Sequence, residues 1–252
     1  VYSHADLTDE DQRVDYPEVK TTAIDNKTED HVGATVSTIV DTVALTNLTV
    51  GKTYTVSGTL MDKATGKAII NKAGEEITAT YGPFEATEKD TTVELSFDVD
   101  VETIENLTAV AFEKLIHNDV VVSYHEEITD EEQTVHYPKI RTTAVATDTN
   151  EHVTKAKAET IIADTVTYEN LLTDGRAYTV KGVLMNKATG EAILVNGEKV
   201  TAEAAFYPKA PSGSVVLTFV FDSSALAGTT IVAYENLYFE GIEVAVHADI
   251  TD

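Results

Sequence analysis

The sequence contains no cysteine and no tryptophan, and its 18 Lys and Arg residues are far outnumbered by 43 Asp and Glu residues. Without cysteine, no disulfide can stabilise the fold in any compartment, so a protein of this kind outside a cell needs another cross-link. The formal net charge of −25 argues against binding to nucleic acid and to anionic membrane surfaces, because both are bound through Lys and Arg. The absence of tryptophan mildly disfavours a carbohydrate-stacking surface.

The sequence also lacks an apolar run long enough to span a membrane, a signal peptide and a sorting tail. We therefore expect it to be an excerpt from a longer protein. The absence of cysteine does not indicate a cytosolic origin, since some extracellular proteins avoid thiols. The acidic balance is typical of a highly soluble, self-repelling surface.

The chain repeats itself with a period of about 122 residues. The segment His125–Gln133 (HEEITDEEQ) has a near-copy at His4–Gln12 (HADLTDEDQ) and a shortened copy at His247–Asp252 (HADITD). The three histidines are spaced by 121 and 122 residues. Tyr16-Pro17 and Tyr137-Pro138 mark the repeat boundaries, because proline cannot donate a ladder hydrogen bond.

These boundaries divide the chain into a tail strand of a preceding repeat (1–16), a first domain (17–138) and a second domain (139–252). The glutamine that closes the second domain would fall three residues beyond Asp252. Both domains contain short stretches of alternating apolar residues, separated by glycine-containing turns, and neither contains a long amphipathic helix. One such stretch has apolar residues at Val93, Leu95 and Phe97. The pattern predicts an all-β protein of two tandem β-sandwich domains.

Four carboxylates occur at positions where burial would be costly unless they are paired or protonated. Glu113 and its counterpart Glu235 share strand parity with apolar neighbours, and Asp41 and Asp164 lie within β-branched runs. Two buried carboxyls that meet would share a proton, and the protonated one could donate a hydrogen bond to a carbonyl. The alternative is that Glu113 lies on the solvated face and that Asp41 begins a turn.

The closing motif and the threonine pairs supply further reactive groups. Each repeat opens with two adjacent threonines, Thr21-Thr22 and Thr142-Thr143, and a threonine hydroxyl becomes a nucleophile when a base takes its proton. His125 and Gln133 can meet only if Thr129 to Glu132 bends, because eight residues of straight strand span roughly 26 Å. The alternatives are ordinary strand threonines and an exposed polar loop.

The motifs shared by both repeats resemble a known family. They are a Thr-Thr-Ala opening, an Asp-Thr-Val block at Asp41 and Asp164, Val-Ala-Phe/Tyr-Glu ending at Glu113 and Glu235, and the closing His-x4-Asp-x2-Gln segment. Their shared order resembles the VaFE repeat, the threonine–glutamine ester-bond domain of Gram-positive surface adhesins. The resemblance covers essentially the whole chain. It implies an Ig-like β-sandwich with an internal ester between a first-strand threonine and a last-strand glutamine, formed with loss of ammonia.

The resemblance also implies roles for individual residues. In the first domain the resemblance makes Thr22 the nucleophile and Gln133 the acceptor. His125 would be the base, and Asp41 and Glu113 would be the acid pair that shares a proton. Asp130 would have a supporting role. The matching residues of the second domain are Thr143, Asp164, Glu235 and His247. The family pattern favours the second threonine of each pair, since parity alone did not choose between them. Gln12 is an acceptor without its own domain, and it could serve Thr143 of a neighbouring molecule.

The function that the resemblance implies is a structural stalk segment of an extracellular, cell-wall-anchored adhesin. Its cross-linking is self-catalysed and single-turnover, so we expect no enzyme activity in the usual sense, no cofactor and no metal. The expected partners are neighbouring repeats of the same stalk. A head-to-tail contact between the N-terminal tail and the second domain of another molecule is an alternative, against which residues 243–252 would compete because they already supply most of that last strand.

Three alternatives remain. A lysine–asparagine isopeptide domain is disfavoured because Lys20 becomes Arg141 and Lys114 becomes Asn236 in the second repeat. A hydrolase or metal enzyme could use recurring histidines such as His31, although no zinc spacing or activated-serine motif is present. An Ig-like ligand-binding adhesin module without a cross-link would have a pocket away from the threonine and the glutamine.

Overall fold

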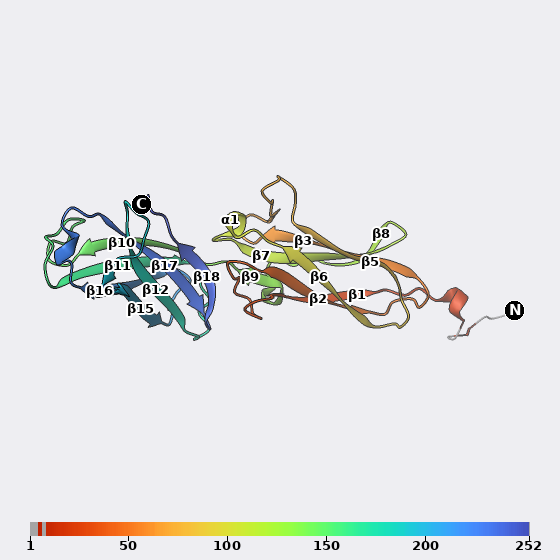
Figure 1. Cartoon of the computed structure of the whole chain (residues 1–252). Coiled ribbons are helices and arrows are strands. Elements are labelled where there is room, and N and C mark those ends of the chain that lie inside the picture. Colours follow the sequence, from red (N-terminus) through yellow and green to blue (C-terminus); the bar gives the residue numbers. More distant parts are fainter. Residues whose placement is uncertain (1–4, 7–8, 252) are drawn as a thin grey trace.

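The computed structural model describes residues 5–6 and 9–251, which form two elongated β-sandwiches placed end to end (Figure 1). Each sandwich has its own hydrophobic core. The predicted all-β fold with two tandem Ig-like domains is therefore confirmed. His4 and Asp252, which belong to the first and last copies of the closing motif, lie outside the described residues. In the described part of the chain, no helix is both long and apolar enough to cross a membrane.

The first domain packs a three-stranded sheet, β1-β2-β6, against a larger sheet centred on β3 and β7. In the larger sheet β3 also pairs with β4 and β5, and β7 also pairs with β8 and β9. A short 3-10 helix, η1 (Glu10–Gln12), precedes the domain. The elements of the domain are β1 (Glu18–Asp25), β2 (Thr38–Thr46), β3 (Thr53–Asp62), β4 (Lys67–Ala68), β5 (Thr78–Glu85), β6 (Thr91–Asp98), α1 (Val101–Ile104), β7 (Thr108–His117), β8 (Val120–His125), η2 (Glu131–Gln133) and β9 (Thr134–His136).

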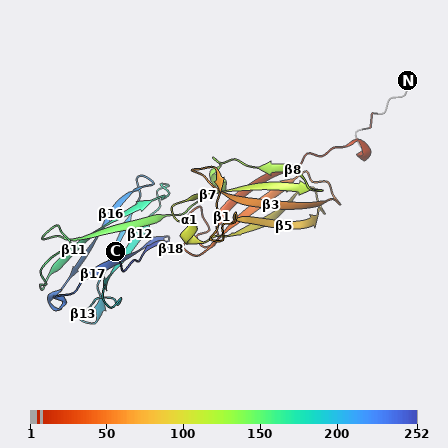
Figure 2. The ribbon, with the colours of Figure 1, turned by 90° about the horizontal axis from the view of Figure 1, so that it is seen from above.

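The second domain repeats this arrangement with the sheets β10-β11-β16 and β15-β12-β17-β18, together with a small β13-β14 hairpin. Figure 2 shows the same two sandwiches from above, with the domains following one another along the chain. The elements are β10 (Lys139–Ala146), β11 (Thr160–Glu169), β12 (Tyr178–Asn186), β13 (Leu194–Val195), β14 (Glu198–Lys199), β15 (Thr201–Phe206), β16 (Gly213–Phe221), η3 (Ser224–Leu226), β17 (Ile231–Phe239) and β18 (Ile242–His247).

The cores follow from alternation along the strands. On β6, Val93, Leu95 and Phe97 are buried while the residues between them are exposed, as the sequence pattern predicts. A glycine on β3, Gly58, leaves room for this packing, because a Cβ there would lie 2.6 Å from the Phe97 ring. Gly58 pairs with Glu113 on β7, so the tight packing is next to a buried carboxylate.

The last strand of the first domain is split. β8 pairs with one half of β7, where His125 is opposite Glu113, and β9 pairs with the other half, where Thr134 is opposite Val110. Between them, residues 126–133 leave the sheet through a turn at 128–129 and the 3-10 helix η2. The bend that the sequence required between His125 and Gln133 is therefore present.

The junction between the domains is polar. Asn170, just after β11, donates from its side-chain amide to the carbonyls of Leu107 (2.7 Å) and Tyr137 (3.1 Å). Arg176 of the second domain pairs with Asp30 of the first. These contacts hold the point where the chain passes from one domain into the next.

Candidate cross-link site

Thr21 is the threonine of β1 that faces the interior. Residues alternate along β1, and Thr21 shares the inner face with the buried Val19 and Ala23. Its hydroxyl donates a short hydrogen bond to Oδ1 of Asp41 on β2 and accepts another from Nε2 of Gln133. The first and last parts of the domain therefore meet at this hydroxyl.

The choice of Thr22 as the nucleophile is wrong. Thr22 is exposed on the outer face of β1, opposite Thr42 of β2, which is exposed too. A shift of one residue along a strand moves a side chain to the other face, so Thr22 cannot reach Gln133 while Thr21 does. The same correction applies to Thr143, which is exposed on β10, whereas its neighbour Thr142 donates a short hydrogen bond to Oδ1 of Asp164.

Gln133 is fully buried, and the bend before it places it there. Asp130 caps η2 by accepting from the backbone N–H of Glu132 at 3.0 Å, and its carbonyl accepts from the Thr134 hydroxyl at 2.6 Å. The glutamine amide nitrogen contacts the Thr21 hydroxyl, and no donor among the described residues reaches its Oε1. The amide carbonyl oxygen is thus buried and can still accept a hydrogen bond.

Asp41 and Glu113 form a fully buried acid pair, so the alternatives of a solvated Glu113 and a turn at Asp41 are wrong. The two side chains lie close enough for each to shift the pKa of the other. Burial raises the pKa of Asp41, and burial together with the nearby charge of Asp41 raises the pKa of Glu113 to about 11. No N–H or O–H of the described residues reaches either oxygen of Glu113, so a proton shared between the two carboxyls is the group that satisfies them.

His125 lies across the strand pair from Glu113, at the end of β8. Its Nε2 is 2.9 Å from Oδ2 of Asp130, the same residue that caps η2 with its other oxygen. Among the described residues, no hydrogen bond joins His125 to Thr21, whose proton points to Asp41. A direct role of His125 as the base that deprotonates the threonine therefore stays a prediction.

The second domain assembles the corresponding threonine, acids and histidine. Asp164 and Glu235 are fully buried, and Glu235 pairs with His247 across β17 and β18, as Glu113 pairs with His125. Gln12 lies in η1, where it is exposed and precedes the first domain.

The structure weakens the competing chemistries. Lys20 is exposed on β1 and pairs with Glu18, and Lys114 is exposed on β7 and pairs with Glu126, so neither lysine faces the interior. The recurring His31 contacts the Thr134 carbonyl at 2.8 Å. Across residues 5–6 and 9–251, no group of three or more His, Asp or Glu side chains is placed to hold a metal ion.

The sequence matches a family model described as a T-Q ester bond containing domain, once over residues 17–137 and once over 138–252. These two matches cover nearly the whole chain. The chain belongs to this family. Both of its T-Q domains thus carry the threonine, aspartate and glutamate constellation described above, and the first also holds a glutamine against the threonine.

Among solved structures, the T-Q chain is similar to two crystal forms of a bacterial adhesin from Mobiluncus mulieris that contains intramolecular disulfide, isopeptide and ester bond cross-links. The P1 form shows 14% identity and a TM-score of 0.38, with 90% of this chain and 82% of that chain covered. The P21 form shows 14% identity and a TM-score of 0.37, with 91% of this chain and 83% of that chain covered. A comparison with curated proteins gave no significant match.

The residue that sequence reasoning missed had a usable signal. Val19 and Ala23 flank Thr21 at a spacing of two, and Ile140 and Ala144 flank Thr142 in the same way. Thr22 instead shares the outer face of β1 with a charged residue, Lys20. Parity with the apolar neighbours therefore identifies the first threonine of each pair as the one that faces the core.

Proposed function

We propose that the first T-Q domain forms an internal ester between Thr21 and Gln133 and that the chain is a cross-linked stalk segment of a bacterial surface adhesin. The observation that carries the proposal is the buried contact of the Thr21 hydroxyl with both the Gln133 amide and the Asp41 carboxylate. A hydroxyl that donates to a carboxylate while touching an amide is oriented for acyl transfer.

The reaction needs only groups that the domain holds. Thr21 Oγ1 forms a bond to the amide carbon of Gln133, and the bond from that carbon to Nε2 breaks. The hydroxyl proton passes first to Asp41, the hydrogen-bond acceptor in this structure, and a proton from the acid pair is given to Nε2. Ammonia leaves, and no other reactant enters or departs.

Glu113 supplies the electrophilic assistance. Its raised pKa keeps it protonated at neutral pH, so the pair can donate a hydrogen bond to the buried Gln133 carbonyl as charge develops on the oxygen. His125 is a positioning residue in this scheme, because Asp130 links its ring to η2 and thereby to the backbone next to Gln133.

The position of the bond suits a load-bearing role. The chain enters the domain before β1 and leaves it after β9, and the bond joins these two ends. A pull on the termini would be carried by residues 17–21, the ester and residues 133–138, so the sheets between them would bear no load. Since each molecule reacts with itself once, we propose an autocatalytic structural protein rather than an enzyme, located outside the cell and anchored to the wall.

The test is the intact mass of the denatured protein with a matched pair of variants. Thr21→Val and Thr22→Val make the same chemical change on opposite faces of β1. We expect the Thr22→Val protein to lose one ammonia like the parent chain, and the Thr21→Val protein to keep its full mass. Loss of the bond in Thr22→Val alone would overturn the assignment.

The chemical class of the bond can be tested separately. An ester is cleaved by alkali far more readily than an amide. Warm alkali is therefore expected to break the cross-link in the denatured protein, which frees the Thr21 hydroxyl and leaves a carboxylate at position 133. Survival of the cross-link under these conditions would show an amide and contradict the proposal.

A further inference from the structure

The segment between β1 and β2, residues 26–37, contacts both the closing strand β9 and the second domain, and we call it the junction loop. Toward β9, the His136 N–H donates to the His31 carbonyl and the Gly33 N–H donates to the His136 carbonyl, both at 2.8 Å. Nδ1 of His31 lies 2.8 Å from the Thr134 carbonyl oxygen. Because β7 pairs with the other edge of β9, the closing strand is held on both edges directly after the acceptor glutamine.

A buried carboxylate that the ester chemistry does not use anchors the junction loop. Asp25 is fully buried, and its Oδ1 accepts the backbone N–H groups of Lys27 at 2.8 Å and Thr28 at 3.1 Å. Its Oδ2 accepts the Ala34 N–H at 3.0 Å and a short hydrogen bond from the Ser37 hydroxyl. Burial of a carboxylate is costly unless it is hydrogen-bonded, so these four bonds favour the one loop shape that makes them all.

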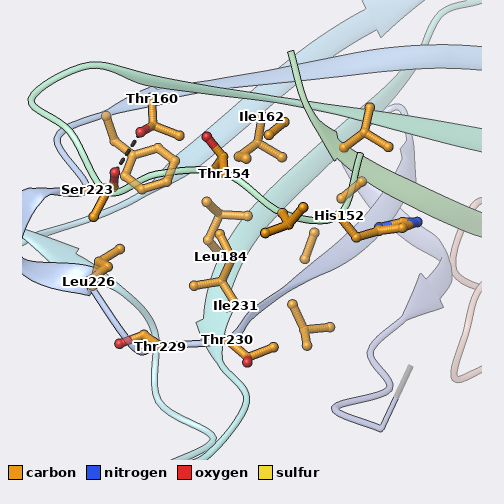
Figure 3. Close-up of a pocket in the computed structure, with 18 of the residues that line it drawn as sticks. His152, Thr154, Thr160, Ile162, Leu184, Ser223, Leu226, Thr229, Thr230 and Ile231 are labelled. Atoms are coloured by element: carbon orange, nitrogen blue, oxygen red, sulfur yellow. Dashed lines mark hydrogen bonds between the residues drawn. The ribbon is translucent and has the colours of Figure 1, made fainter. Parts of the chain in front are cut away.

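The matching loop of the second domain, residues 147–159, has Ala146 in the place of Asp25. Its far end is held by Ser223, whose hydroxyl oxygen lies 2.6 Å from that of Thr160 (Figure 3). The threonine and the acids of the second domain nevertheless take the same arrangement as those of the first. A carboxylate at this position is therefore not needed to assemble the acid site, and the contacts of Asp25 serve the junction loop itself.

The other side of the junction loop is covered by the second domain. Val32 is fully buried and packs with the hydrophobic core of the second domain. Asp30 pairs with the guanidinium group of Arg176, whose Nη2 donates to Oδ1 of Asp30 at 3.0 Å. The Thr35 N–H donates to the carbonyl of Glu243 on β18 at 3.1 Å. The second domain thus supplies an apolar contact, an ion pair and a backbone hydrogen bond to the same loop that holds β9.

The second domain also contacts the closing strand directly. Asn170 donates to the carbonyl of Tyr137, the residue after β9, and its Oδ1 lies 3.1 Å from Nδ1 of His136 within β9. The same Oδ1 accepts the hydroxyl of Thr108 on β7 at 3.0 Å. One side chain of the second domain therefore ties β9 to the strand beside it.

We propose that the second domain positions the closing strand of the first and thereby brings Gln133 against Thr21, with Asn170 and Arg176 as its positioning residues. The inference rests on the proposed function, since it concerns the rate of the same ester. Gln133 directly precedes β9, so a movement of β9 away from β7 and the junction loop carries the amide away from the threonine hydroxyl. A displacement of about 1 Å is enough to slow a reaction by about 100-fold.

The coupling acts in both directions. Docking of the second domain favours the placed β9, and a placed β9 favours docking to the same extent, because coupling free energies are reciprocal. The ester fixes the start of β9 and so holds His136 and Tyr137 where Asn170 contacts them. The order of events is therefore docking first and cross-linking second, and the cross-link then stiffens the junction.

The test is the rate at which the full chain loses ammonia. The protein is made in a short pulse of cell-free synthesis, portions are transferred to denaturant at set times, and intact mass gives the cross-linked fraction. Asn170→Gly removes the amide without straining the backbone, since a φ of 63° suits glycine. We expect this variant to react at least about fivefold more slowly, which is the factor for the net loss of roughly one hydrogen bond.

Asn47→Gly is the matched control. Asn47 has a φ of 56° after β2, as Asn170 has after β11, and its amide donates to the Tyr16 carbonyl rather than to β9. Its rate should equal that of the parent chain. Hydrogen exchange of the second domain in each variant shows that this domain is folded, so that a slower reaction reports lost positioning rather than lost structure.

A second set of variants tests the ion pair. Arg176→Gln should also slow the reaction, whereas Arg176→Lys keeps a cation opposite Asp30 and should retain most of the parent rate. Arg141→Gln, the same change at an exposed position on β10, is the control. Parent rates in both Asn170→Gly and Arg176→Gln would overturn the inference and leave the proposed ester standing. A parent chain that loses no ammonia would overturn the proposed ester, and the inference with it.

Discussion

The two domains carry the same reactive constellation but differ at one edge. The first domain is closed by β9 and by Gln133, whose amide lies against Thr21. The second has the matching Thr142–Asp164 contact and the buried Glu235, and no glutamine among the described residues contacts its threonine. The comparison teaches that the threonine and the acids take the same arrangement in both domains, so the strands that carry them, rather than contact with a glutamine, position them.

The largest expected effect is on the stability of the closed domain. The cross-link joins residues 112 positions apart, and a cross-link around a loop of that size removes about 4.7 kcal/mol of chain entropy from the unfolded state. Thr21→Val should therefore lower the free energy of unfolding of the first domain by about 4 kcal/mol and leave the second domain unchanged. Chemical denaturation, followed by hydrogen exchange of each domain separately, measures the two free energies of unfolding. An equal loss in Thr22→Val would mean that the cross-link is not the cause.

A second prediction concerns the acid pair. The pKa of Glu113 is raised from 4.5 to about 11 in the folded state, so between these values the folded domain holds a proton that the unfolded chain has lost. This carboxyl therefore makes stability fall as the pH rises, by at most about 1.4 kcal/mol per pH unit. Asp41, whose pKa is also raised, acts in the same direction.

Glu113→Gln in the Thr21→Val background should flatten this decline, because the amide does not titrate and no ester is present to hydrolyse. Denaturation midpoints between pH 5 and 9 measure the slope. An unchanged slope would show that Glu113 is not the group that holds the proton.

Much of the fold could be predicted from the sequence, because alternation marks the half-buried strands. The apolar residues of β6 are an example, and they are buried as predicted. The parity of Glu113 with its apolar neighbours left its burial open, and the structure shows that it is buried. The choice between Thr21 and Thr22 required the same alternation to be applied to β1, where the family pattern had pointed to the wrong residue.

Other features depend on contacts between distant segments. Asp25 is fully buried, and the backbone N–H groups of Lys27, Thr28 and Ala34 donate hydrogen bonds to its carboxylate. The aligned residue of the second domain is Ala146. No local pattern distinguishes Asp25 from an exposed aspartate at the end of a strand.

The most direct test of the central claim is tandem mass spectrometry of peptides from the denatured parent chain. The account predicts that the peptide beginning after Lys20 is joined to the peptide containing Gln133, with the loss of one ammonia, and that fragmentation places the bond on Thr21. Unlinked peptides with an intact Gln133 amide, or a bond on Thr22, would contradict it.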